Sequence, residues 1–227
     1  MKIVSWNCGG KFRDKFKKIL ELDADIYVIQ ECENPEKYGS EEYKQMMANS
    51  HWVGKYQYKG LAVFTTRSDI KLELLDWDGK DKRLFLPIRV NDKFTLLGVW
   101  ACDPYIEEFY DYKALNEEHM TDDLIMIGDF NSSVLFDKVH RGKGKSHTIV
   151  VEQLREKGIE DIYHHLTGEK QGHEKCPTFF SAKHLEWPYH IDHCFSNPKN
   201  VSSMKIHTRY DWLNKSDHLP LEIETTL

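Results

Sequence analysis

A carboxylate and a carboxamide follow a buried stretch near the middle of the chain. Four consecutive apolar residues (124–127) lead through Gly128 to Asp129 and Asn131. Two residues apart on an extended backbone, these two side chains point to the same side. Such a pair can orient a water molecule or bind a hard cation through its oxygens. The same residues can also end a strand in an Asx turn, where they satisfy local backbone groups.

Two more polar residues stand at the ends of predicted strands near the N-terminus. The pattern at 2–7 predicts a strand ending at Asn7, and 25–31 predicts one ending at Glu31. Between them, apolar residues at helical spacing (12–20) predict an amphipathic helix. A strand–helix–strand unit of about 30 residues brings two strand ends to one sheet edge, where α/β proteins place ligands. We therefore expect Asn7 and Glu31 to lie at such an edge.

Two clusters of aspartate and histidine follow late in the chain. Asp192 stands between His190 and His193 in a strand-like context, and Asp217-His218 precedes an apolar segment at 219–221. An aspartate beside a histidine is common by chance. A hydrogen-bonded turn histidine is therefore the alternative to a catalytic one at each position.

In chain order, these positions form the series WN, QE, GDFN, HIDH and SDH. The order and spacing resemble the endonuclease/exonuclease/phosphatase superfamily, and the resemblance runs from Asn7 to His218. It implies an α/β fold, a four-layer sandwich of two packed, mostly antiparallel β-sheets flanked by helices. It also implies hydrolysis of phosphoester bonds with Mg²⁺ or Mn²⁺ as cofactor.

The resemblance also implies a role for each matched residue. Glu31 is similar to the direct carboxylate ligand of the metal. Asp129 resembles the residue that orients or deprotonates the attacking water, with Asn131 holding it and the phosphate. Asp192 resembles the partner that orients His218, which would contact the scissile phosphate. The implied catalytic residues are Asp129, Asn131, Asp192 and His218, and the implied metal residues are Asn7, Glu31 and Asp217.

These residue types suit phosphoester chemistry. Mg²⁺ takes oxygen ligands and is usually held by one or two carboxylates. A phosphodiester gains negative charge on its equatorial oxygens in the transition state, and a cation and an imidazolium stabilise that charge. An aspartate hydrogen-bonded to a histidine fixes the tautomer of the ring and raises its basicity.

Three positions depart from the family pattern. Gly9 stands where the abasic-site nucleases of the family carry an aspartate. Residues 99–102 match a segment that often supplies a catalytic histidine or tyrosine. His190 replaces the arginine or similar residue that usually precedes the late strand. These departures weaken an assignment as an abasic-site nuclease and leave the acid, metal and histidine positions intact.

The substrate is less sharply indicated. The net charge of −6 gives no global attraction to nucleic acid and favours a small or single-stranded substrate over long duplex DNA. The basic segment at 138–147 is either a solvated loop or a phosphate-contacting one. Exposed aromatic residues would favour nucleic acid, because bases stack on aromatic faces, whereas core packing is the alternative for each. The aromatic candidates are Trp187, Tyr189 and Trp212, and the predicted substrate-binding residues are Arg141, Lys143, Lys145 and His190.

Three functions remain open. The first is a Mg²⁺-dependent phosphodiesterase or nuclease, with a nucleic acid or a small phosphodiester as its partner. The second is a phosphomonoesterase acting on a small phosphorylated metabolite or head group. The third is a non-catalytic binding module that keeps the fold. Such a module would be expected to have lost acids from the series, and this chain keeps them.

Composition predicts a single domain spanning 1–227. The 227 residues are 40% hydrophobic and 30% charged, enough to bury a core without disulfides. Five widely spaced cysteines favour free thiols in a reducing cytosol. No stretch approaches the roughly 20 apolar residues of a membrane span, and no secretory signal is expected. We therefore expect a cytoplasmic protein with no membrane association and no obligate protein partner.

Further elements are predicted from periodicity and turn residues. Residues 91–93 predict a hairpin turn. Helices are expected at 41–48, 105–120 and 148–157, and strands at 61–65, 70–75, 84–90, 94–100, 178–181, 190–196, 203–210 and 219–225.

Overall fold

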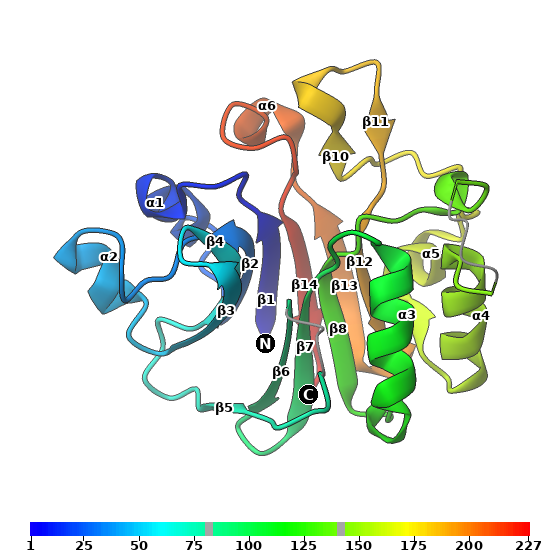
Figure 1. Ribbon diagram of the computed structural model, residues 1–227, viewed down its shortest axis with the longest axis horizontal. Coiled ribbons are helices and arrows are strands. Elements are labelled where there is room, and N and C mark those ends of the chain that lie inside the picture. Colours follow the sequence, from blue (N-terminus) through cyan, green and yellow to red (C-terminus); the bar gives the residue numbers. More distant parts are fainter. Residues whose placement is uncertain (80–83, 140–143) are drawn as a thin grey trace.

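Two β-sheets pack face to face and carry helices on their outer faces (Figure 1). The computed structural model describes residues 1–79, 84–139 and 144–227. Helices α1 (Phe16–Leu20) and α2 (Glu41–Met46) cover the first sheet, and α3 (Ile106–Leu115) and α4 (His147–Glu156) cover the second. The predicted α/β sandwich is confirmed.

The first sheet has six strands in the order β13-β14-β1-β2-β4-β3. Strands β1 and β2 run parallel, as predicted for the strand–helix–strand unit, and the other neighbours pair antiparallel. The strands are β1 (Lys2–Asn7), β2 (Ile26–Cys32), β3 (Ser50–Tyr56), β4 (Lys59–Phe64), β13 (Val201–Ile206) and β14 (Leu221–Thr225).

The second sheet has the order β5-β6-β7-β8-β12-β9. Here β7 and β8 run parallel, joined through α3, and the other neighbours pair antiparallel. Its strands are β5 (Leu72–Leu74), β6 (Phe85–Val90), β7 (Phe94–Trp100), β8 (Leu124–Asp129), β9 (Glu160–Asp161) and β12 (Asp192–Ser196).

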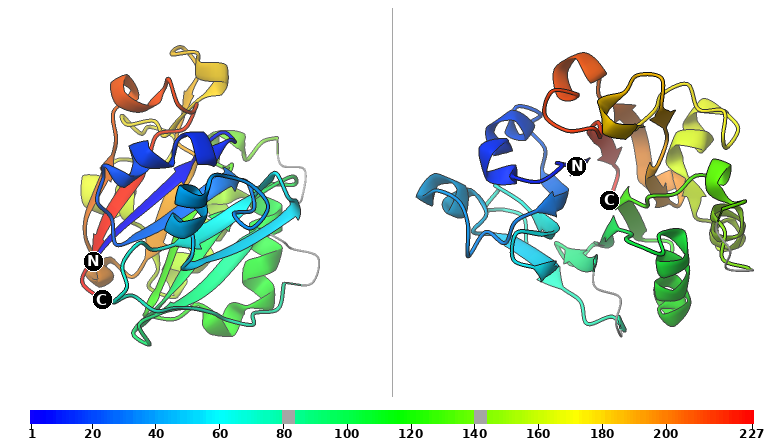
Figure 2. Two further views of the ribbon diagram at one scale, coloured as in Figure 1. Left: turned by 90° about the vertical axis from the view of Figure 1, so that its left-hand side faces the viewer. Right: turned by 45° about the horizontal axis from the view of Figure 1, so that its top comes forward.

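Smaller elements gather mainly at one end of the sheets, opposite the chain termini (Figures 1 and 2). Strands β10 (Phe179–Phe180) and β11 (Pro188–Tyr189) form a hairpin there, next to α6 (Arg209–Trp212). Helix α5 (Ile162–Thr167) packs against β12. None of the described helices is long and apolar enough to cross a membrane. The 3₁₀ helices are η1 (Phe12–Asp14), η2 (Glu117–His119), η3 (Val134–Phe136), η4 (Ser181–Lys183) and η5 (Pro198–Asn200).

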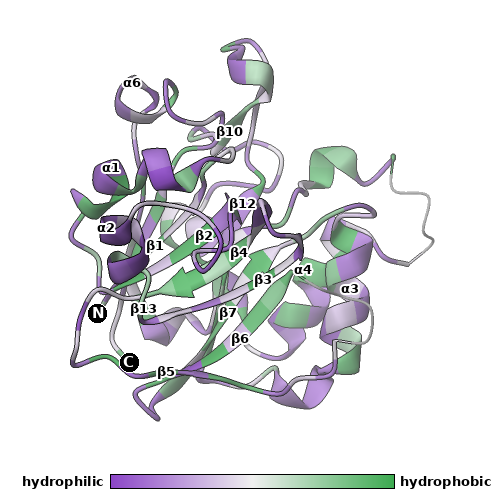
Figure 3. Cartoon of the chain, turned by 60° about the vertical axis from the view of Figure 1, so that its left-hand side comes forward, coloured by the Kyte–Doolittle hydropathy of each residue, from purple (hydrophilic) through white to green (hydrophobic). Residues whose placement is uncertain are grey.

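Strand β8 shows why the central strands are apolar on both faces. Ile125 and Ile127 pack in the core between the two sheets, whereas Leu124 and Met126 pack under the helices of the second sheet. A strand covered on both sides reads as a continuous apolar run, which is what the sequence carries at this position. Figure 3 shows the hydrophobic residues concentrated on the strands and the hydrophilic ones on the outer segments.

Most sequence-predicted elements are present, with several differences. The predicted hairpin turn is confirmed, and Asn91 and Asp92 both have positive φ there. The strand predicted at 203–210 is wrong beyond Ile206, because α6 begins at Arg209. Strands β3, β9 and β11 and helices α5 and α6 were not predicted.

Candidate active site

A cleft of about 590 Å³ opens where β1, β2 and β8 end. Six of the seven predicted catalytic and metal residues line it, and the seventh, Asp192, hydrogen-bonds to His218 from behind. The structure therefore brings the whole predicted set together from both sheets. The six that line the cleft are Asn7, Glu31, Asp129, Asn131, Asp217 and His218.

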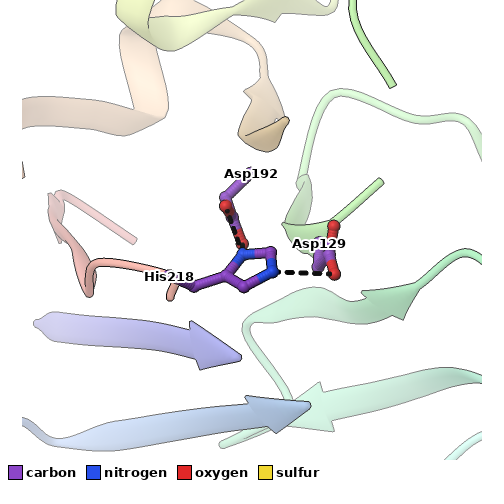
Figure 4. Close-up of side chains that lie close together, drawn as sticks. All are labelled: Asp129, Asp192 and His218. Carbon is purple, nitrogen blue, oxygen red and sulfur yellow. Dashed lines mark hydrogen bonds and ion pairs between the residues drawn. The ribbon is translucent and has the colours of Figure 1, made fainter. Parts of the chain in front are cut away.

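Asp192 and His218 form a buried pair (Figure 4). The Nδ1 of His218 lies 2.9 Å from the Oδ2 of Asp192, so this nitrogen donates to the carboxylate. The other nitrogen, Nε2, points toward Asp129 and lies 3.9 Å from its Oδ2. Phe179 packs on the imidazole with 4.5 Å between ring centroids. The ring is thus fixed in orientation, with one nitrogen directed at the acid of β8.

The Asp129 carboxylate is fixed by three donors. The side-chain amide of Asn7 lies 2.9 Å from Oδ2, that of Asn131 lies 3.1 Å from Oδ2, and the backbone N–H of Asn131 donates to Oδ1 at 2.8 Å. Asn131 adopts a positive φ, which turns the chain back over the carboxylate. The Asx turn considered as the alternative therefore exists. It also positions the acid within the cleft.

Burial and charge shift the pKa values of both groups. Removal from water, together with the nearby Asp192 carboxylate, raises the pKa of Asp129 to about 7 despite the opposing charge of His218. For His218, burial alone would lower the pKa, but the Asp192 and Asp129 carboxylates outweigh it and raise the pKa to about 9. A carboxylate that titrates near neutrality beside an imidazolium is an arrangement suited to acid–base work.

Glu31 owes its position to an irregularity in β2. The register of β2 against β4 shifts between Gln30 and Cys32, and Glu31 itself has a φ of 60°. A β-bulge of this kind re-aims one side chain out of the sheet pattern. The carboxylate points into the cleft, where the Lys59 ammonium lies 3.0 Å from its Oε2.

Among the residues that the structure describes, two groups of side chains are candidates for holding a metal ion. Asp129, Asp192 and His218 offer ligand atoms that all lie within 4.8 Å of one another. However, the raised pKa of His218 favours its protonated ring, which has no lone pair to give to a metal. This group therefore fits a metal poorly while the pair is charged.

The second group, Glu31 with Asn7 and Asp217, fits a hard cation better. Its members offer carboxylate and amide oxygens, which Mg²⁺ prefers. A cation is already stabilised at this position, since the ammonium of Lys59 contacts Glu31. Asn7 is buried, and its amide nitrogen faces Glu31, 3.5 Å from Oε1, while its amide oxygen accepts from the backbone N–H of Gly9. Asn7 would therefore have to turn its amide to give an oxygen to the ion, and the two carboxylates are the direct ligand candidates.

Gly9 and Gly128 both have positive φ, and an added Cβ would lie close to a neighbour at each position. Gly9 has a φ of 62°, and a Cβ there would lie 3.2 Å from the Oγ of Ser216. Gly128 has a φ of 153°, and its Cβ would lie 1.9 Å from the carbonyl oxygen of Val99. Gly128 therefore has no room for a side chain, whereas at Gly9 the backbone favours glycine and the contact with Ser216 is only tight.

The sequence did not single out the lysines of the site. Lys15, Lys183 and Lys215 line the cleft, and Lys59 contacts Glu31. They come from four separate segments, so no local pattern marks them. The cleft thus collects positive charge in a protein whose net charge is −6.

The predicted substrate-binding residues lie elsewhere or outside the described part. Arg141 and Lys143 are outside the described residues. Lys145 pairs with Asp111, with 2.7 Å between Nζ and Oδ1. His190 does not reach the cleft: it is buried, and its Nδ1 lies 2.9 Å from the carbonyl oxygen of Cys176. The expectation that His190 contacts substrate is corrected on this ground.

Solved structures of known proteins share the fold of this chain. No protein-family model matches the chain, and no curated protein matches it by sequence. Among solved structures, a 3′-5′ exonuclease (NExo) from Neisseria meningitidis superposes with a TM-score of 0.71 at 20% identity, covering 100% of both chains. The chain therefore has the DNase I-like fold.

Two further structures share the DNase I-like fold with this chain. An AP endonuclease from Archaeoglobus fulgidus has a TM-score of 0.68 at 17% identity and covers 100% of both chains. The catalytic domain of Xenopus laevis APE2 has a TM-score of 0.70 at 18% identity and covers 99% of this chain and 91% of its own. At these identities the likeness concerns the fold, and the chemistry has to be argued from the cleft.

Proposed function

We propose that this protein is a metal-dependent phosphoesterase that cleaves phosphodiester bonds in nucleic acid by attack of water. The observation that carries the proposal is one cleft that holds a buried carboxylate at Asp129, the Asp192–His218 pair and an oxygen-ligand group at Glu31. Structures of the same fold support the substrate class: one is a 3′ phosphatase, NExo, from Neisseria bound to a product DNA hairpin.

Asp129 acts as the base in this proposal. Its three hydrogen bonds hold the carboxylate in one orientation, and its pKa of about 7 lets it accept a proton near neutral pH. A water molecule placed beside Oδ2 would lose its proton to Asp129 as it attacks phosphorus. Asn131 keeps the carboxylate aimed at that water.

His218 faces the phosphate as an imidazolium. Asp192 holds the Nδ1 proton, so Nε2–H is directed toward Asp129 at the cleft (Figure 4), where it would donate to a phosphoryl oxygen placed beside that carboxylate. Charge on that oxygen grows in the transition state, and a fixed positive donor stabilises it without reorganisation.

Glu31, Asn7 and Asp217 would hold Mg²⁺ or Mn²⁺. When bound, such an ion neutralises phosphoryl charge and stabilises the leaving oxygen. The lysines that line the cleft, Lys15, Lys183 and Lys215, add diffuse positive charge around the phosphate.

A second hollow favours a nucleotide over a small phosphate ester. A pocket of about 340 Å³ lies beside the cleft and shares Asn131 and Phe179 with it. Its other walls include Phe136, Tyr189 and Ile191. An apolar, aromatic pocket next to a phosphate site suits a sugar or base attached to that phosphate.

The test compares ester classes with and without metal. The protein should hydrolyse bis(p-nitrophenyl) phosphate and a DNA oligonucleotide in Mg²⁺, and EDTA should abolish both activities. Asp129→Asn should lower kcat by about a hundredfold or more while the protein stays folded. Hydrolysis of p-nitrophenyl phosphate alone would point to a phosphomonoesterase, and no hydrolysis of any ester would refute the proposal.

A further inference from the structure

The hairpin between β3 and β4 carries two exposed tyrosines. The strands end at the pair Tyr56 and Lys59, so Gln57 and Tyr58 form the turn. Tyr56 is 51% exposed and Tyr58 is 58% exposed. Their rings stack on each other, 5.5 Å apart with 13° between planes. Two large aromatic side chains thus stand together in solvent, where burial does not account for them.

The hairpin tip is held in place. The backbone N–H of Asn34 donates to the carbonyl of Gln57 at 2.7 Å, and the amide of Asn34 lies 2.8 Å from the Oε1 of Gln57. The chain after β2 therefore braces the turn from the side. A braced aromatic stack loses little conformational entropy when a ligand packs on it.

The tip also joins the cleft. Lys59, at the start of β4, contacts Glu31 at 3.0 Å, and its ammonium lies 5.4 Å from the ring centroid of Trp100 on the second sheet. Strand β4 pairs with β2, whose end forms the cleft wall, and β3 lies on the far side of β4 at the sheet edge. Figure 3 shows these strands together. Lys59, the residue after Tyr58, thus links the end of the hairpin to the candidate metal ligand.

The positive charge of the hairpin tip favours an anionic ligand. The segment Lys55-Tyr56-Gln57-Tyr58-Lys59 carries two lysines and no acid, in a chain with a net charge of −6. The ammonium of Lys55 lies 5.3 Å from the ring centroid of Tyr56. Alternating cations and aromatic rings suit a polyanion that carries flat bases.

We propose that the hairpin tip, residues 55–59, is a stacking surface for an unpaired base of the substrate strand. This inference rests on the proposed function, because the same strand would place its scissile phosphate in the cleft. The outer face of the Tyr56–Tyr58 stack receives the base, and Lys55 contacts the adjoining phosphate. The surface contributes to holding the strand and takes no part in the bond cleavage.

The test compares a strand with a small diester that fills only the cleft. In the full chain, Tyr56→Ala/Tyr58→Ala should raise KM for a single-stranded oligonucleotide about tenfold. The same change should leave kcat, and KM for bis(p-nitrophenyl) phosphate, unchanged. Tyr56→Phe/Tyr58→Phe should keep wild-type values, because the ring stacks without its hydroxyl. Tyr210→Ala is the matched control, since Tyr210 is 82% exposed on α6 and also lies beside a cation, Arg209.

Binding measured in EDTA separates this inference from the proposed function. Fluorescence anisotropy with a labelled single strand should show about tenfold weaker binding for the double alanine variant than for wild type. If the wild type hydrolyses no ester, the proposed function fails, and anisotropy still decides the stacking surface. Equal affinity of the two proteins would overturn the inference, as would an equal rise in KM for both substrates.

Discussion

Two buried aspartate–histidine pairs lie close together in this molecule and differ in where the second ring nitrogen points. In the cleft pair, His218 contacts Asp192 at 2.9 Å. In the interior pair, His193 contacts Asp161 at 2.8 Å. The Nε2 of His193 lies 2.9 Å from the carbonyl oxygen of Ser132, whereas that of His218 faces the cleft.

The difference separates a chemical role from a structural one. Both nitrogens of His193 face protein acceptors, so this ring has no donor left for a ligand. Instead it ties β12 to Ser132, the residue after Asn131. Asp192 and His193 are consecutive in sequence and point to opposite sides of β12. An aspartate–histidine pair is therefore a candidate catalyst only where its free nitrogen meets a cavity.

The largest expected effect distinguishes the cleft pair. His218→Ala or Asp192→Asn alone should lower kcat by about a hundredfold to ten-thousandfold, because each removes the directed donor. The double variant should be little worse than the worse single, since residues that act as a unit lose activity non-additively. Steady-state rates on an oligonucleotide measure this. Losses that multiply would mean that the two residues act separately.

Substitution in the interior pair should lower the stability of the fold more than it lowers activity. His193→Ala removes one partner of a buried pair and should lower the free energy of unfolding by about 3 kcal/mol. Because His193 does not touch the cleft, kcat should change by less than about tenfold, through Ser132 alone. Urea denaturation and kinetics at a temperature where the variant is folded check both values. A kcat loss as large as that of His218→Ala would erase the distinction between the pairs.

Substitutions in the cleft should weaken metal binding, whereas substitutions in the interior pair should not. Glu31→Gln removes the charge of the proposed carboxylate ligand and should weaken Mg²⁺ binding by at least about tenfold. Asp161→Asn, in the interior pair, should leave the affinity unchanged. Isothermal calorimetry on both folded variants decides. Unchanged Mg²⁺ affinity in Glu31→Gln would mean that other residues bind the metal.

The smallest expected effect is a pH dependence of stability that comes from His164, which lies beside Asp161 of the interior pair. Burial would lower the pKa of His164, but its hydrogen bonds to Asp161 and Glu174 outweigh this and raise it to about 9. Against an unfolded value of about 6.5, the protonated ring stabilises the fold below pH 6.5, and this contribution is lost as pH rises through about 9. The Tm should therefore fall by about 2–4 °C over this range.

Variants of neighbouring histidines sharpen this measurement. In His164→Gln, the fall in Tm between pH 6.5 and 9 should become smaller, because one ring with a pKa raised to about 9 is gone, while His218, whose pKa is also raised to about 9, still titrates in this range. His165→Gln is the matched control, since His165 is the next residue and is exposed on the surface. Calorimetric scans across this pH range would contradict the assignment if the two variants behaved alike.

The sequence was most informative where strands are buried on both faces. The runs that became β1, β2 and β8 are mostly apolar, and each carries a polar residue of the cleft at or next to its last position. Strand β3 was missed because it lies at the sheet edge, is only partly buried, and carries polar residues that break the pattern. Helix α5 is a short helix of six residues, too brief for its periodicity to show.

Residues that depend on packing between distant segments escaped prediction. His190 stands two residues before Asp192, so alternation along a continuous strand would direct both to the cleft. The strand β12 begins only at Asp192, and Tyr189 pairs with β10 instead, so the alternation does not extend to His190. Lys59 reaches Glu31 through the bulge in β2, which no local pattern announces.

The first strand and the last cleft residues are joined, and this determines when the site can exist. The indole nitrogen of Trp6 donates to the carbonyl of His218 at 3.1 Å, and the Oγ of Ser216 donates to the carbonyl of Asn7 at 2.7 Å. These contacts close a loop of more than 200 residues, which makes folding depend on long-range encounters. During synthesis, β1 emerges first and waits for residues 216–218, so the nascent chain has no assembled cleft until they leave the ribosome.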